Sequence, residues 1–194
     1  MKVRSLLRIV VLATLTALLS IPISANAQTG KQFFVELSPI YFLYEGGGGA
    51  FGREKGRWQN GFAFSTFNPD KFYSQGKLSL TGSISAVRTM SFEPFTKFYF
   101  SKERKWLYLG LNIVPEFYTL EDDKTGEQAL SVSAYAKPKI GCRWFPFKRI
   151  FYVDAGYTMS FKIFESELTQ ISSSQLQYAD FVGAPELSIG VRIK

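Results

Sequence analysis

The sequence LSVSAYAKPKIGCRWFP, residues 130–146, alternates apolar and polar side chains along its whole length. Its even positions carry apolar or small residues such as Val132 and Ile140, and its odd positions carry polar residues such as Ser133 and Lys137. Period-two alternation predicts a β-strand with one apolar face and one polar face. A globular strand usually has about five or six residues, so a strand of this length is typical of a tall β-barrel wall.

Similar alternation recurs along the chain and predicts eight strands. They cover residues 32–43, 58–67, 77–89, 91–100, 107–118, 130–146, 150–164 and 181–193. No stretch places apolar residues at helical spacing for three turns, and no linker divides the chain. The smallest outer-membrane barrels have about eight long antiparallel strands. We therefore expect an all-β fold, an eight-stranded antiparallel up-and-down transmembrane β-barrel.

The amino terminus has the sequence pattern of a secretion signal. Basic residues near the start precede an apolar or small-residue run over 9–19, and Ala25-Asn26-Ala27 is an A-x-A cleavage site. The apolar run extends only to Ile23, short of the roughly 20 residues that a membrane anchor needs. We expect cleavage between Ala27 and Gln28, so that residues 1–27 are a signal peptide and 28–194 form a single barrel domain.

The composition after residue 27 agrees with export to a membrane. All 19 Phe, 10 Tyr and 3 Trp lie in this part, a load that suits a lipid-facing wall with aromatic girdles. Cys142 is the single cysteine, so the fold must hold without an internal disulfide. After residue 27 the 20 basic and 16 acidic side chains are interleaved and give a mild net charge of +4. This pattern does not favour a nucleic-acid-binding surface.

Paired charges occupy the polar faces of the predicted strands. We expect these side chains in the lumen as a structural charge network: Glu36, Glu93, Lys97, Glu116, Lys137, Lys139, Arg143, Asp154, Lys162, Glu186 and Arg192. An eight-stranded barrel is just wide enough for side chains to fill, and isolated buried charges are costly. The near-balance of acids and bases predicts salt bridges that plug the lumen. Alternation alone also allows a soluble barrel with these charges in water.

The order of the segments FEPFTKFYF (92–100), WLYLGLNIVPEFY (106–118), AYAKPKIGCRWFPFKR (134–149), FYVDAGYTMSF (151–161) and LSIGVRIK (187–194) resembles the small outer-membrane β-barrel domains of Gram-negative bacteria. It is most similar to porin-like barrels of the Bacteroidetes kind, related in architecture to outer membrane protein A. The resemblance is one of pattern over 31–194. It implies an outer-membrane location, outer-membrane lipid and the barrel-assembly machinery as partners, and no catalytic residues.

The sequence contains no histidine, which excludes Ser-His-Asp hydrolysis and histidine-based metal sites. Two-carboxylate or Ser–Lys chemistry stays open in principle, but the spacing of the acids indicates neither. The cluster Glu121-Asp122-Asp123 lacks the alternating spacing of a calcium loop. We expect no enzyme, no cofactor and no metal site.

The glycine-rich segment 46–56 contains Gly47-Gly48-Gly49-Ala50-Phe51-Gly52, a formal match to G-x-G-x-x-G. A dinucleotide site needs a helix next, and Arg53-Glu54-Lys55-Gly56-Arg57 has no apolar helix face. We interpret 46–56 as a flexible loop, in which Arg53, Lys55 and Arg57 are either solvated or close to lipid phosphates at the outer surface.

These patterns favour a structural or surface-interaction role at the outer membrane, with loops 44–58, 121–128 and 165–180 as the contact surface for an extracellular partner that the sequence does not identify. The alternatives are a narrow porin for small solutes and a secreted, lipocalin-like binding barrel. In the membrane model, Phe151, Val153, Leu109, Leu111 and Ile140 contact lipid, while Lys137, Lys139, Glu116 and Asp154 point inward.

Overall fold

Eight antiparallel strands close into a barrel in the computed structural model, which describes residues 32–67, 78–81, 84–147, 150–165, 170–171, 174–178 and 180–193. The barrel strands are β1 (Gln32–Leu37), β2 (Gly47–Lys55), β3 (Trp58–Phe67), β5 (Ile84–Tyr99), β6 (Trp106–Asp122), β7 (Gln128–Phe147), β8 (Phe151–Glu165) and β11 (Phe181–Ile193). Each strand pairs with its neighbour along the chain, and β1 pairs with β11 to close the barrel. The predicted fold class is confirmed. The predicted signal peptide and its cleavage site lie outside the described residues.

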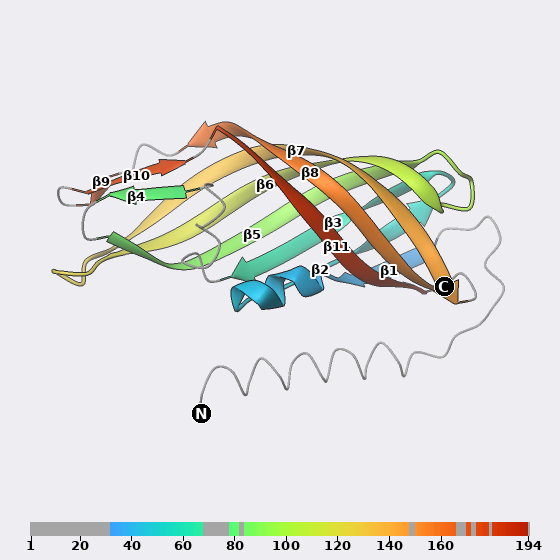
Figure 1. Cartoon of the computed structure of the whole chain (residues 1–194), viewed down its shortest axis with the longest axis horizontal. Coiled ribbons are helices and arrows are strands. Elements are labelled where there is room, and N and C mark those ends of the chain that lie inside the picture. Colours follow the sequence, from blue (N-terminus) through green and yellow to red (C-terminus); the bar gives the residue numbers. More distant parts are fainter. Residues whose placement is uncertain are drawn as a thin grey trace, which may run out of the picture.

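The two ends of the barrel differ in their connections. Residues 56–57 and 100–105 join strands by short turns at one end, where β1 begins and β11 ends. We call the other end the long-connection end, because it holds the connection 38–46 besides the β6–β7 turn at 123–127. It also carries a small sheet made of β4 (Leu78–Thr81), β10 (Ser174–Tyr178) and β9 (Gln170–Ile171). Figure 1 shows the small sheet at the left and the C-terminus at the right. Short turns at one end, together with the start of the first strand and the end of the last, are the arrangement of outer-membrane barrels.

The predicted strand boundaries are wrong in the first half of the chain. The glycine-rich segment 46–56 contains strand β2, so it is not a flexible loop, and 44–58 is not a contact loop. The first strand ends at Leu37 instead of residue 43, because Pro39 starts the 3-10 helix η1 (Pro39–Tyr44). The predicted strands 77–89 and 91–100 are also redrawn: β5 runs continuously over 84–99, and β4 belongs to the small sheet. The total stays at eight because β2 replaces the strand lost by this merger.

The connections that were expected to form the contact surface also differ from the prediction. Strands β6 and β7 extend into the predicted loop 121–128 and leave only a turn at 123–127. The predicted loop 165–180 contains β9 and β10. The long-connection end therefore presents strand-supported structure where extended loops were predicted.

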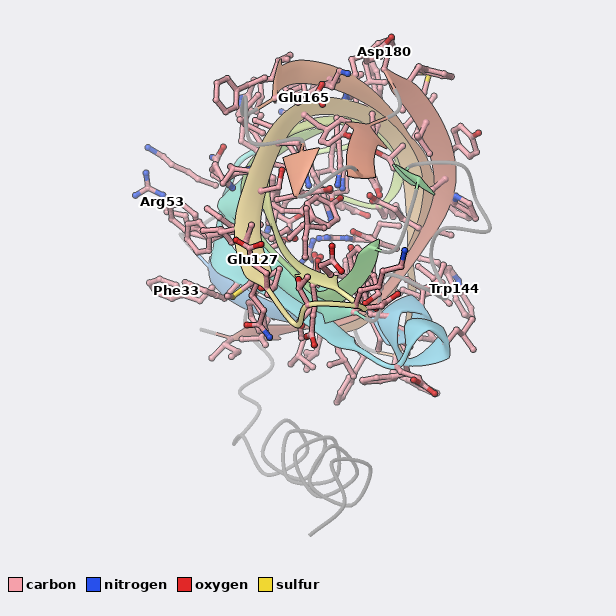
Figure 2. All side chains as sticks on the ribbon, turned by 90° about the vertical axis from the view of Figure 1, so that its left-hand side faces the viewer. Phe33, Arg53, Glu127, Trp144, Glu165 and Asp180 are labelled. Atoms are coloured by element: carbon pink, nitrogen blue, oxygen red, sulfur yellow. The ribbon has the colours of Figure 1, made fainter. Side chains whose placement is uncertain are left out.

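The wall has an apolar outer face and a polar inner face. Outward side chains such as Leu109, Leu111 and Ile140 are each more than 40% exposed. Inward side chains such as Glu116 and Asp154 are almost completely buried. Figure 2, a view into the long-connection end, shows side chains filling the interior, with Phe33 and Trp144 projecting away from it. The period-two alternation of the strands produces this division directly.

The wall is incomplete on one side of β11. Strand β1 pairs with β11 only over Ile189–Ile193, so residues 181–188 of β11 have no strand neighbour on that side among the described residues. Helix η1 occupies this position and contacts β11, β2 and β3. Pro185 lies in the unpaired half, and sheets accommodate proline mainly at edges. The sequence therefore encodes a short β1 and a 3-10 segment that covers the gap.

Candidate functional site: the charged lumen

Arg143 of β7 is the centre of the lumen and is completely buried. Its guanidinium forms two hydrogen bonds to Asp154, with Nε–Oδ1 at 2.6 Å and Nη2–Oδ2 at 2.9 Å. The same group donates to Glu54 at 2.5 Å and to Glu36 at 3.1 Å. Because Arg143 and Asp154 lie directly opposite each other on β7 and β8, the register itself creates the bidentate pair.

Two tyrosine rings enclose the Arg143 guanidinium. Its central carbon lies 3.6 Å from the ring centroid of Tyr152 and 4.7 Å from that of Tyr99. Tyr152 donates its hydroxyl hydrogen to Glu36, and Tyr99 donates to Gln59. The planar cation therefore lies over two aromatic rings while its nitrogens bind carboxylates, a geometry that lysine cannot reproduce.

Lys97 extends this cluster across the lumen from β5. Its ammonium lies 2.7 Å from Asp154 and 3.3 Å from Glu36. Glu36 also accepts a hydrogen bond from the side-chain amide of Gln59 at 3.0 Å. Each carboxylate in this layer thus has several donors, as buried charges require.

Three guanidinium groups surround Glu54 toward the short-turn end. Its carboxylate pairs with Arg143, with Arg104 at 2.9 Å and with Arg192 at 2.7 Å. Arg104 also donates to the side chain of Gln32 and to the carbonyl oxygen of Gly56. These contacts bind the turn after β5 to β1 and β2 and fill the barrel at this end.

A second cluster lies farther along β6 and β7. Lys137 lies 3.3 Å from Glu116 and 3.7 Å from Glu93. Asn112 donates to Glu93 at 2.9 Å, and Tyr118 donates to Glu116. Here one base faces two acids, whereas the cluster around Arg143 holds more bases than acids.

Two further lysines from the predicted set differ in their surroundings. Lys139 pairs with Glu186 at 2.7 Å inside the barrel. Lys162 instead pairs with Glu165 and Asp180, each at 2.8 Å, and Asp180 is largely exposed. Lys162 therefore pairs with residues at the rim of the long-connection end.

Among the described residues, the lumen network balances six acids against six bases. The acids are Glu36, Glu54, Glu93, Glu116, Asp154 and Glu186, and the bases are Lys97, Arg104, Lys137, Lys139, Arg143 and Arg192. The excess of bases around Arg143 is offset by the excess of acids around Lys137. A neutral set of this size can be buried because each charge has an opposite partner nearby.

Two members of the network, Glu54 and Arg104, were missed in the sequence. Glu54 follows Ala50 and Gly52 at the same parity, so period two continues through the glycine-rich segment, but glycines conceal it. Arg104 lies in a turn and has a positive φ of 54°, a backbone conformation that sequence periodicity does not report. The even position of Glu54, shared with Ala50 and Gly52, was the one signal in the sequence that could have placed it on the polar face.

Room inside the barrel is limited. A cavity of about 60 Å³ lies beside Glu36, Lys97, Tyr41 and Glu186. At about 15 Å³ for each water this volume holds about four molecules. Tyr41 enters this region from η1, and its ring stacks on Phe67 at a centroid distance of 6.1 Å. The cavity is a small pocket lined by members of the charge network.

The described residues contain no group of three or more His, Cys, Asp or Glu side chains arranged to hold a metal ion. Asp122 of the acidic cluster accepts hydrogen bonds from the backbone N–H groups of Lys124 and Thr125. It therefore stabilises the turn between β6 and β7. No helix in the described part of the chain is long and apolar enough to cross a membrane.

Comparison with known proteins identifies a similar fold. No protein-family model matches the chain, and no curated protein matches its sequence. Among solved structures, the N-terminal β-barrel domain of Pseudomonas aeruginosa OprF is similar, with a TM-score of 0.52 and 12% sequence identity. The match covers 87% of this chain and 100% of that domain. At this identity the likeness concerns the fold, a closed barrel of the outer-membrane type.

Proposed function

We propose that the protein is a non-enzymatic outer-membrane β-barrel with a structural or surface-interaction role and a lumen closed by its charged side chains. The observation that carries this proposal is the inverted arrangement of the wall, with charges paired inside and large apolar side chains outside. Bulk water would penalise such a continuous apolar exterior, and lipid would not. The fold match supports the same location.

The soluble, lipocalin-like alternative requires the opposite arrangement, because a secreted binder encloses apolar residues and exposes charged ones. Leu109, Ile140 and Phe161 are each more than 40% exposed on three neighbouring strands. The largest fully buried side chain is an arginine. These observations favour the membrane barrel.

The closed lumen favours a structural role over transport. Arg143 alone connects residues of β1, β2 and β8 across the interior. A solute would have to displace several such pairs, each costly to break. The long-connection end, where the small sheet of β4, β9 and β10 stands, is then the surface that partners contact outside the cell.

Export by the signal peptide at 1–27 and insertion by the barrel-assembly machinery complete the proposal. Fractionation tests the location: the protein should appear with outer-membrane detergent extracts and migrate differently on a gel before and after heating. Recovery in an osmotic-shock supernatant without detergent would contradict the membrane location.

Bilayer conductance tests the closed lumen. The refolded wild-type protein should give no large, stable single-channel steps, because ion pairs fill the interior from the Glu54 cluster to the Lys137 cluster. A Lys105→Gln variant, altered at a partly exposed turn residue, serves as a matched control and should also be silent. Large and stable steps from the wild type would favour the narrow porin instead.

A further inference from the structure

The outer face of β1, β2, β3 and β5 carries a groove of about 660 Å³. Its floor includes Gly52 and Gly61, which lie directly opposite each other on β2 and β3. Phe33, Phe51 and Phe62 stand along it, each between 43% and 59% exposed. The volume lies within the range of about 300–1,000 Å³ for small-molecule sites. The groove is therefore a concave apolar feature on an outer wall from which many large apolar side chains project.

Phe34 and Phe95 support the floor of the groove from inside. Their rings lie 6.0 Å apart, and both side chains are at least 93% buried. A Cβ added at Gly61 would lie 2.9 Å from the Phe34 ring and 2.3 Å from the carbonyl oxygen of Phe51. The glycines thus let the strands and the inner rings approach closely, and Gly52 and Gly61 leave the backbone itself as part of the groove lining.

Arg53 forms the polar end of this groove. It lies on β2 opposite Asn60 and next to Phe33 on β1, and Figure 2 shows both Arg53 and Phe33 projecting outward on the same side of the barrel. Arg53 makes no ion pair with a described residue, in contrast to the arginines of the lumen. Its inward neighbour Glu54 is fully buried and bound to other guanidinium groups.

Aromatic residues mark the level at which Arg53 lies. All three tryptophans, Trp58, Trp106 and Trp144, are about half exposed and lie near the short-turn end. Tryptophan concentrates at the membrane–water interface, where headgroups lie. Arg53 is three residues from the β2–β3 turn at this end, so its long side chain reaches headgroup level while the groove extends into the apolar band.

We propose that this groove binds a glycerophospholipid, with the Arg53 guanidinium on the phosphate and an acyl chain along the phenylalanines. A planar guanidinium matches the paired oxygens of a phosphate, and Arg53 makes no ion pair with a described residue that would compete for it. Lys55 and Arg57 are exposed beyond it and add positive potential at the same rim. The site rests on the proposed membrane location.

Native mass spectrometry of the full chain refolded in neutral detergent tests the site. The probes are dioleoyl phosphatidylglycerol and dioleoylglycerol, which share acyl chains and differ in the phosphate. We expect one retained phosphatidylglycerol per barrel and little dioleoylglycerol. Arg53→Gln should weaken phosphatidylglycerol retention about fivefold, the effect of one charge at a headgroup.

Two variants separate charge from shape. Lys102→Gln removes an exposed charge from another short turn at the same end and should retain phosphatidylglycerol as the wild type does. Asn60→Trp places a bulky side chain at the groove beside Arg53 and should reduce retention with the charge intact. Equal retention of the two lipids, or equal retention by wild type and Arg53→Gln, would overturn the lipid site.

Vesicle insertion, followed by heat-modifiable migration, distinguishes failure of the site from failure of the proposed function. A wild type that does not insert overturns the membrane location and the lipid site together. A wild type that inserts normally and shows no phosphate preference overturns the lipid site alone.

Discussion

Arg143 is the residue on which the interior depends most. Replacing it with methionine keeps an unbranched apolar stem of smaller length and leaves Asp154, Glu36 and Glu54 without their shared cation. Removing one partner of a buried ion pair typically costs about 3–5 kcal/mol. We expect Arg143→Met to lower the free energy of unfolding by this amount, as measured by urea titration of the protein in vesicles.

Arg143→Lys refines that expectation, because lysine keeps the charge and loses the bidentate geometry and stacking. The free energy of unfolding of Arg143→Lys should lie between those of the wild type and Arg143→Met. Lys105→Gln, at a partly exposed ion pair, should stay close to wild type. An Arg143→Met variant as stable as Lys105→Gln would show that the network contributes little to stability.

Leu111 tests the outer face of the same barrel. It is 43% exposed in the middle of β6, where a lysine should lower the free energy of unfolding by about 2–4 kcal/mol if it lies near the bilayer midplane. Ser133→Ala is the inward control, since the Ser133 hydroxyl is buried without a hydrogen-bond partner among the described residues and its loss should cost much less. Urea titration in vesicles with bilayers of two thicknesses would compare the free energies of unfolding of the two variants. A Leu111→Lys variant as stable as the wild type would place this face in water.

At the scale of elements, Tyr41 of η1 packs closely against β2 at Gly48. A Cβ at Gly48 would lie 2.3 Å from Cδ2 of the Tyr41 ring, closer than atoms pack. Gly48→Ala should therefore destabilise the barrel by about 1–3 kcal/mol through overpacking. In a Tyr41→Ala background the ring is absent, so the same change should cost clearly less.

A double-mutant cycle on Gly48 and Tyr41 measures this coupling from unfolding free energies. Equal costs of Gly48→Ala in both backgrounds would mean that η1 does not press on β2 in solution. The cycle thus tests whether η1 covers the gap beside β11, where β1 is too short to complete the wall.

At the scale of the whole molecule, the two ends should face different compartments. Cys142 is the single cysteine and is exposed on the outer face, so labelling uses a Cys142→Ala background. Lys124→Cys, in the β6–β7 turn, should react with a membrane-impermeant maleimide on intact cells. Arg57→Cys, in the β2–β3 turn, should react only after the outer membrane is permeabilised, because short turns face the periplasm.

The reverse labelling pattern would invert the barrel and remove the long-connection end as the outer contact surface. Labelling of both positions on intact cells would indicate a protein that does not span the membrane. The assay therefore addresses location and orientation together.

Local alternation by itself determined the all-β fold class and showed which side chains of a long strand such as β7 share a face. These properties depend on whether a side chain is at an odd or even position, and the sequence displays parity directly. The strand count agreed with the structure only because β2 replaced the strand lost where 77–89 and 91–100 were redrawn. The odd–even pattern is not visible where residues lack side chains or where a turn intervenes. For this reason the glycine-rich β2, with its Glu54, was interpreted as a loop. The pattern also fails at Pro39, where a local backbone constraint ends β1 early.

Only the closed tertiary structure decided which charges meet. Glu36 and Arg143 are separated by 107 positions in the chain and still form a hydrogen bond. Their meeting depends on the order of strands around the barrel and on the register between each pair, which non-local closure sets. The same closure placed Arg53 and its groove on the outer wall. It also left residues 181–188 of β11 without a described strand partner on the β1 side, because β1 has only six residues.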